Sequence, residues 1–208
     1  MFATSPLTVG EMAQDMIAVI SALGHKTVDL LGFSLGGFVA QGLVLKQPDL
    51  VRKLILTGTG PAGGEGIDRV GAVSWPLIIR GMLTFREPKF YLFFTRTANG
   101  KRAAKAFLAR LKERAKDRDK GLNPRAFLRQ LKAIQAWGRQ MPQDLGRIRI
   151  LTLVANGDND TMMPTQGSHD MARRIPLVDL VIYPDVGHGG IFQYHETFVP
   201  KALDFLAA

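Results

Sequence analysis

The chain has 208 residues, which is the length of one domain or of one domain with an added lobe. Its composition, with 46% hydrophobic and 22% charged residues and no cysteine, excludes a disordered or collagen-like chain, a disulfide scaffold and any metal or redox site built on cysteine. The net charge of +9 comes from one segment, Lys101–Lys132, which contains 12 Lys and Arg residues and 3 Asp and Glu residues. We expect this segment to form either a solvated helix face or a surface for an acidic partner.

The beginning of the chain carries no sign of a targeting segment. Residues 1–10 lack the basic run and the apolar stretch of a signal peptide. The most apolar stretch, residues 28–45, contains Asp29 and several glycines, which favours a strand, a turn and a helix over a membrane span. We therefore expect a cytoplasmic protein that does not bind a membrane.

The first part of the chain predicts a helix followed by a strand–helix–strand unit. A capping-box pattern and apolar residues at every third or fourth position predict a helix over residues 8–24. Buried strands are expected at residues 27–33 and 51–56, with a helix at 37–45 between them. This order implies that the two strands pair in parallel.

The middle of the chain, residues 66–146, differs in character. It is rich in Arg and Lys, and its periodicity predicts helices at residues 103–116 and 124–137 without a clear strand. We interpret it as a helical cap that interrupts the core.

The alternation of strand and helix resumes after this segment. The expected elements are strands at residues 148–156 and 177–183 and helices at about 166–174 and 197–206. We therefore predict an α/β fold with a parallel sheet flanked by helices. Its core comprises residues 1–65 and 147–208, and its inserted helical cap comprises residues 66–146.

A G-x-S-x-G motif, Gly32 to Gly36, lies between a predicted strand and a predicted helix, which is the context that this motif requires. On such a turn Ser34 has a strained backbone, and its hydroxyl lies at the positive end of the helix. Because strand and helix nearly collide there, we expect no room for a Cβ at Gly32 or Gly36. We expect Gly37 to let the helix start close to the sheet. The N–H of Leu35 is expected to stabilise an oxyanion.

A serine hydroxyl is a poor nucleophile near pH 7 without a base. Of the four histidines, His188 lies among glycines after the last predicted strand, at the sheet edge where α/β proteins bind ligands. For His25, His169 and His195 a surface or capping role is the better interpretation.

The base in turn needs an acid to hold its tautomer. Asp158 and Asp160 follow the strand predicted at residues 148–156, and either carboxylate could serve. Glu65 is an outside candidate, and Asp185 is too near His188 in sequence to be the obvious choice.

Three stretches resemble the α/β-hydrolase superfamily. Residues 28–60 look like its nucleophile elbow and next strand, residues 151–164 like its acid loop and residues 180–190 like its histidine loop, while residues 66–146 look like its helical cap. The order serine, aspartate, histidine is also that of this superfamily. The resemblance implies a serine hydrolase that needs no metal or cofactor. It implies Ser34 as nucleophile, His188 as base and Asp160, the fourth residue of a G-x-x-D turn, as acid, with Asp158 second.

The chain departs from the superfamily pattern before the elbow. Only the helix of residues 8–24 precedes it, whereas similar proteins begin with several strands. We expect a fragment of a longer hydrolase, or a chain that forms a homo-oligomer through the exposed edge of the strand at residues 27–33. The missing portion includes the loop that supplies a second oxyanion N–H, so weak or no esterase activity and poor solubility are expected of this chain alone.

The expected activity is hydrolysis of an ester or related acyl bond of a small molecule through an acyl-enzyme. The alternatives are a lactone or carbon–carbon bond hydrolase with the same triad, and a non-catalytic interaction protein whose basic segment binds an acidic partner. Nucleic acid is not expected, since the basic segment has no recognised reader motif. Aromatic residues of the cap could line an apolar pocket, although for most of them the cap's own core is the better interpretation; they are Trp75, Phe85, Phe90, Tyr91, Phe93, Phe94 and Trp137.

Overall fold

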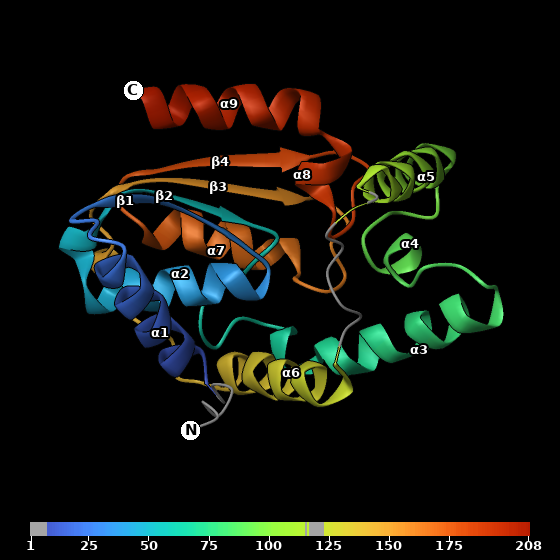
Figure 1. Cartoon of the computed structure of the whole chain (residues 1–208), viewed down its shortest axis with the longest axis horizontal. Coiled ribbons are helices and arrows are strands. Elements are labelled where there is room, and N and C mark those ends of the chain that lie inside the picture. The colour runs from blue at the N-terminus through green and yellow to red at the C-terminus, as the bar shows by residue number, and fades with distance from the viewer. Residues whose placement is uncertain (1–7, 115, 117–122) are drawn as a thin grey trace.

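The computed structural model describes residues 8–114, 116 and 123–208, which form an α/β fold around one parallel sheet (Figure 1). In this part of the chain the sheet has four strands in the order β1, β2, β3, β4, and every neighbouring pair is parallel. The strands are β1 (Val28–Phe33), β2 (Val51–Thr57), β3 (Leu151–Gly157) and β4 (Val178–Tyr183). The predicted fold class is therefore confirmed.

Strand β3 begins later than the sequence predicts. A short 3₁₀ helix, η3 (Leu145–Arg147), precedes it, and the N–H of Ile148 donates to the carbonyl of Leu145 at 3.0 Å. Pairing with β2 starts only where Leu151 lies opposite Lys53. Ile148 is nevertheless fully buried, so its apolar character reflects the core and not the sheet ladder.

Helices cover both faces of the sheet (Figure 1). One face carries α1 (Val9–Ala22), α2 (Leu35–Lys46) and α7 (Thr165–Arg174), and the other carries α9 (His195–Ala207). The short helices η1 (Pro48–Leu50) and α8 (Gly190–Gln193) lie in the connections. The apolar side chains between the layers make the core on each face, because burying them removes their surface from water.

The local sequence explains where α1 and α2 begin. Thr8 caps α1 and makes the predicted capping box with Glu11, each side chain accepting from the other residue's backbone N–H. Helix α2 begins at Leu35, two residues before the predicted start, because the turn at Ser34 already directs the chain into the helix.

Between β2 and β3 the described residues form helices. They are η2 (Ile67–Arg69), α3 (Val70–Leu83), α4 (Lys89–Leu92), α5 (Ala98–Glu113) and α6 (Pro124–Gly138). Helix α5 starts earlier than predicted because the Thr97 hydroxyl accepts the N–H of Gly100 and caps it. Asn123 caps α6 through the N–H of Arg125, with Pro124 at the first position as predicted. The helix predicted at residues 103–116 ends earlier than expected, at Glu113, because the backbone of Arg114 is extended; residue 115 lies outside the described residues.

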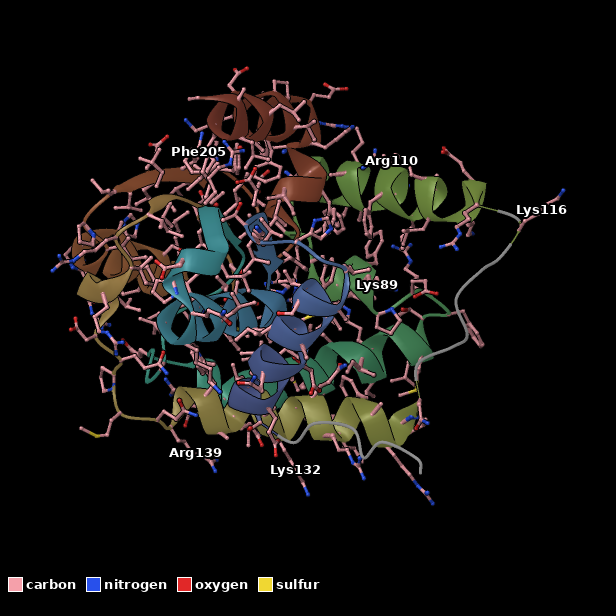
Figure 2. The ribbon with its side chains drawn as sticks, turned by 60° about the vertical axis from the view of Figure 1, so that its left-hand side comes forward. Lys89, Arg110, Lys116, Lys132, Arg139 and Phe205 are labelled. Carbon is pink, nitrogen blue, oxygen red and sulfur yellow. The ribbon has the colours of Figure 1, made fainter. Side chains whose placement is uncertain are left out.

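The basic segment Lys101–Lys132 is divided in space. Figures 1 and 2 show α5 beside α8 at one end of the molecule and α6 on the opposite side, so that Arg110 and Lys132 point away from each other. Residues 117–122 of the segment lie outside the described part. The charges of α5 and α6 thus belong to two surfaces and not to one continuous patch.

Strand β1, which leads to the motif serine, is an edge strand of the described sheet. It pairs with β2 on one side, and Leu31 is 49% exposed. In the part of the chain that the structure describes, no helix has both the length and the apolar character needed to cross a membrane.

Candidate active site

Ser34 lies on the sharp turn between β1 and α2. Its backbone has φ 53° and ψ −122°, which is strained for a residue with a side chain, as the motif predicts. The Ser34 N–H donates to the carbonyl of Thr57 in the neighbouring strand at 2.9 Å, which holds the turn against the sheet. The hydroxyl does not cap the helix, so it stays available to another partner.

The glycines around the turn differ from the expectation in one respect. A Cβ on Gly32 would lie 2.5 Å from the carbonyl oxygen of Gly36, and a Cβ on Gly37 would lie 2.5 Å from the hydroxyl oxygen of Thr59. These two positions must be glycine because backbone or packed side chain already fills the space. A Cβ on Gly36 meets nothing within 4 Å, so the expectation that Gly36 also leaves no room is wrong. The collision at Gly32 involves the backbone of residue 36 and not its side-chain position.

His188 joins Ser34 to Asp160. Its Nε2 lies 3.0 Å from the Ser34 Oγ and its Nδ1 lies 2.8 Å from the Asp160 Oδ2. A carboxylate can only accept, so Nδ1 carries the proton and Nε2 accepts from the serine hydroxyl. The His188 and Asp160 side chains are almost fully buried, which shields the pair from water.

The buried Asp160 carboxylate has a donor for each oxygen. The backbone N–H groups of Met162 and Met163 both donate to Oδ1 at 2.9 Å, while Oδ2 accepts from His188. A buried negative charge is tolerated only where hydrogen bonds compensate it. The turn after β3 provides these bonds, and it is the reason that this carboxylate is held toward the imidazole.

The other predicted candidates lie elsewhere. Asp158 is exposed, and its carboxylate accepts the N–H of Val186 at 3.1 Å, so it ties the acid loop to the histidine loop. Glu65 is exposed after β2. Among the described residues, neither carboxylate is hydrogen-bonded to His188, and none of the other three histidines is hydrogen-bonded to Ser34; these are His25, His169 and His195.

An aromatic cluster surrounds the His188 ring, and sequence reasoning did not find its arrangement. The ring centroid of Phe33 lies 4.9 Å from that of His188, and the Phe93 centroid lies 5.3 Å away in an edge arrangement. Phe192 packs on both phenylalanines. The three rings come from β1, the α4–α5 connection and α8, so only the tertiary structure brings them together.

Asp185 connects the histidine loop to the helical segment above it. Its carboxylate accepts from the hydroxyls of Thr95 and Thr97 and from the amide of Asn99, at 2.9 to 3.1 Å. The hydrogen bond from Thr97 does most to hold the pKa of this carboxyl below its usual value; partial desolvation opposes it, and the bonds from Thr95 and Asn99 lower the pKa further. Sequence reasoning set Asp185 aside as the triad acid and missed this contact.

Replacing Asp185 with Asn is expected to lower the melting temperature by roughly 2–4 °C near neutral pH. Because the folded-state pKa is lowered, the charge contributes stability above about pH 4, and this contribution is lost as the pH falls through the lowered pKa. Asn also accepts the positive φ of 54° at this position. Thermal unfolding from pH 3 to 7 measures the effect, with the exposed Asp15→Asn as control. A difference that persists unchanged at the lowest pH contradicts the prediction.

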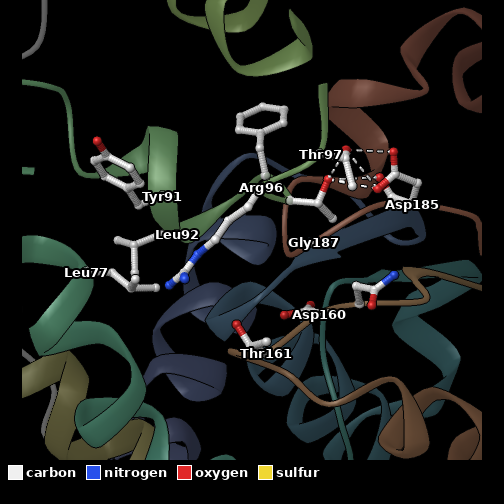
Figure 3. A pocket seen from close by; sticks show the side chains of 12 residues that line it. Leu77, Tyr91, Leu92, Arg96, Thr97, Asp160, Thr161, Asp185 and Gly187 are labelled. Carbon is white, nitrogen blue, oxygen red and sulfur yellow. Dashed lines mark hydrogen bonds between the residues drawn. The ribbon is translucent and has the colours of Figure 1, made fainter. Parts of the chain in front are cut away.

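A pocket of about 680 Å³ lies next to Asp160, between the helical segment and the acid and histidine loops (Figure 3). Leu77, Tyr91 and Arg96 line it from the helical side. Asp160 and Gly187, which precedes His188 in the chain, line it from the core. The pocket is therefore next to the buried Asp160–His188 pair.

The aromatic residues of the predicted cap lie in different surroundings: some line the pocket, some are buried in apolar clusters and two are exposed. Tyr91 and Phe94 line the pocket, and Phe93 contacts His188. Phe90 and Trp137 are buried in apolar clusters, as expected for a core role. Phe85 is fully exposed and Trp75 is 42% exposed, so neither of these two lines the pocket or is buried.

Two further features bear on the chemistry. The N–H of Leu35, the first residue of α2, has no earlier turn of helix to accept it, and N–H groups at the start of a helix can bind an anion. Within residues 8–114, 116 and 123–208, no three His, Asp or Glu side chains are grouped as metal ligands.

In sequence, the chain is similar to proteins that are described as hydrolases. Residues 3–193 match the family described as alpha/beta hydrolase fold. The chain is 30% identical over 206 residues to a 2-hydroxy-6-oxononadienedioate/2-hydroxy-6-oxononatrienedioate hydrolase of Klebsiella pneumoniae, and this match covers 94% of the chain and 67% of that protein.

Solved structures agree with this result. An alpha/beta hydrolase fold protein from Chitinophaga pinensis is 37% identical with a TM-score of 0.90, over 98% of this chain and 74% of that one. Est816, described as an N-acyl homoserine lactone degrading enzyme, is 25% identical with a TM-score of 0.71, over 97% of this chain and 77% of that one. The match over nearly the whole chain, on a parallel sheet with a serine turn, shows that the protein belongs to the α/β-hydrolase family and is a hydrolase.

Proposed function

We propose that the protein is a serine hydrolase that cleaves an ester or related acyl bond of a small molecule through an acyl-enzyme. The observation that carries this proposal is the hydrogen-bonded series from the Ser34 hydroxyl through His188 to Asp160. A nucleophile, a base and an acid that orients the base are the three parts that acyl transfer by serine needs. No cofactor or metal enters the proposed reaction.

The proposed mechanism has two halves. Ser34 Oγ attacks the carbonyl carbon while its proton passes to His188 Nε2, and the resulting oxyanion accepts the N–H of Leu35. The intermediate collapses, the alcohol leaves with the proton from His188, and the acyl group stays on Ser34. Water then attacks this ester, losing its proton to His188, and the acid leaves as the Ser34 hydroxyl is restored.

Asp160 acts in both halves by holding the imidazole. Its carboxylate accepts from Nδ1, so the ring presents Nε2 to Ser34, and its charge stabilises the imidazolium that forms in each step. Burial of the pair strengthens this interaction, because fewer water molecules screen it. Phe33 and Phe93 restrict the ring to the orientation that serves Ser34.

Labelling with a fluorophosphonate probe tests the proposal, since the probe reacts with an activated serine and not with an ordinary hydroxyl. We expect one adduct on the purified chain, located at Ser34 by mass spectrometry and absent from Ser34→Ala. The matched control is Ser21→Ala, which removes an exposed hydroxyl of α1 and should still be labelled. An unlabelled wild-type chain, or labelling that survives Ser34→Ala, would overturn the assignment.

The second candidate keeps the same three residues and hydrolyses a lactone. It is favoured by the likeness to Est816, which is described as degrading N-acyl homoserine lactones. In this case the leaving hydroxyl stays attached to the acyl group after ring opening. Comparing turnover of p-nitrophenyl butyrate with ring opening of an N-acyl homoserine lactone, each with Ser34→Ala as blank, distinguishes the two.

A further inference from the structure

Arg96 carries the one positive charge among the side chains that line the 680 Å³ pocket. It lies on the connection between α4 and α5, and Figure 3 shows its side chain reaching into the pocket on the side of Leu77 and Leu92. Within the described part of the chain, no hydrogen bond or ion pair engages its guanidinium. A guanidinium offers five donors in a planar fork, which suits a carboxylate in particular.

The backbone of Arg96 is held in place on both sides. The hydroxyls of its neighbours Thr95 and Thr97 both donate to Asp185 at 2.9 Å. The same loop is tied to the core a second time, because the N–H of Gly189 donates to the carbonyl of Phe93 at 2.7 Å. The backbone on both sides of Arg96 is therefore held against the core, and its exposed side chain extends from this anchored segment.

The two carboxylates of the pocket wall already have donors. Asp160 accepts from His188 and two backbone N–H groups, and Asp185 accepts from three side chains. Neither needs Arg96 as a partner. Arg96 is thus the charged side chain of the pocket wall that has no partner among the described residues, and it is exposed to solvent.

Two more arginines act on Tyr91, although they do not line the pocket. The Arg80 guanidinium lies 4.8 Å from the centre of the Tyr91 ring, and the Tyr91 hydroxyl is hydrogen-bonded to Thr84 at 3.0 Å. The bond with Thr84 and, after it, the charges of Arg86 and Arg80 hold the pKa of this phenol below its usual value. Asp160 and Asp185 thus lie on the core side of the pocket, whereas Arg96 lines its helical side and Arg80 lies against Tyr91.

We infer that the pocket binds the acyl part of an anionic substrate, with a carboxylate of that substrate paired to Arg96 while the scissile carbonyl lies at Ser34. This inference rests on the proposed serine hydrolase function and names its substrate class. Leu77 and Leu92 beside the guanidinium provide the apolar wall for the methylene chain between the two ends. Arg96 acts on specificity and not on the chemical step.

Two esters of matched length test this inference: mono-p-nitrophenyl adipate, which carries a terminal carboxylate, and p-nitrophenyl hexanoate, which does not. We expect a higher kcat/KM for the adipate ester. The ratio of the two kcat/KM values should fall about tenfold in Arg96→Gln, because a hydrogen-bonded charge is lost. Arg96→Lys should keep part of the preference, and raising the salt concentration should reduce it. Arg139→Gln, at the residue that follows α6, removes the same charge from a position that does not line the pocket, and it is the matched control.

The outcomes separate this inference from the proposed function. Equal kcat/KM for the two esters, or an unchanged ratio in Arg96→Gln, overturns the role of Arg96 while Ser34-dependent turnover still stands. If neither ester is turned over, calorimetric titration of adipate into the Ser34→Ala chain and into Ser34→Ala/Arg96→Gln decides the matter without catalysis. Binding that requires Arg96 supports the inference, and absent or Arg96-independent binding contradicts it.

Discussion

Replacing Asp160 with Asn is expected to lower kcat by about four orders of magnitude, the effect of the same change in serine protease triads. In the wild type, Oδ1 accepts two backbone N–H groups and Oδ2 accepts from His188. An Asn that keeps its oxygen toward Met162 and Met163 turns its NH₂ toward the imidazole. Nδ1 then has to accept, so the proton moves to Nε2, which can no longer take the proton of Ser34.

The steady-state rate of ester hydrolysis measures this effect, and Asp158→Asn is the matched control. Asp158 is two residues away on the same turn, but it is exposed and contacts the N–H of Val186 instead of His188. Its replacement is expected to change kcat by no more than about threefold, as for a surface substitution. Near-native unfolding temperatures for both variants exclude loss of fold as the cause. Equal losses in the two variants would contradict the assignment of Asp160 as the acid.

Gly32→Ala is expected to destabilise the fold by at least about 3 kcal/mol, or to prevent folding altogether. The added Cβ would lie 2.5 Å from the oxygen and 2.7 Å from the carbonyl carbon of Gly36, and 2.7 Å from the Cα of Gly37. These are backbone atoms at the start of α2, so relief requires the whole helix to move away from β1. Such a movement also displaces Ser34, which lies between the two elements.

Gly36→Ala separates this steric effect from the general cost of replacing a motif glycine. Its Cβ meets no atom within 4 Å, and alanine is more favourable than glycine in a helix by about 1 kcal/mol. We expect stability equal to or slightly above that of the wild type. Urea unfolding of the two variants beside the wild-type chain measures the difference. A Gly36→Ala variant as unstable as Gly32→Ala would show that the collision at Gly32 is not the cause.

The turn that holds Ser34 shows how far local pattern carries a prediction. A glycine-flanked serine between a buried strand and a helix specifies a strained turn, because few backbone conformations join the two elements so closely. The same reasoning assigned a steric role to Gly36 that belongs to Gly32 and Gly37. The pattern cannot tell which atoms collide, since that depends on how close α2 lies to β1 and to Thr59.

The choice between Asp158 and Asp160 shows where sequence reasoning ends. Both follow β3 on one short turn, and both are acidic. The N–H groups of Met162 and Met163 direct the Asp160 carboxylate inward, whereas Asp158 turns out to the histidine loop. This difference of backbone direction within three residues has no periodic signal.

The sequence by itself determined the α/β class, the serine turn and the positions of the strands that precede each site loop, because these depend on hydrophobic spacing and glycine placement over a few neighbouring residues. Only the tertiary structure decided which side chains meet. Ser34 and His188 are separated by 154 residues in the chain. Phe93 and Arg96 come from the helical segment, and Asp185 comes from the loop packed against it. The structure also distributed the basic charges of α5 and α6 over two surfaces. These arrangements follow from how the helices pack on the sheet, which depends on the shapes of surfaces far apart in the chain and not on any local pattern.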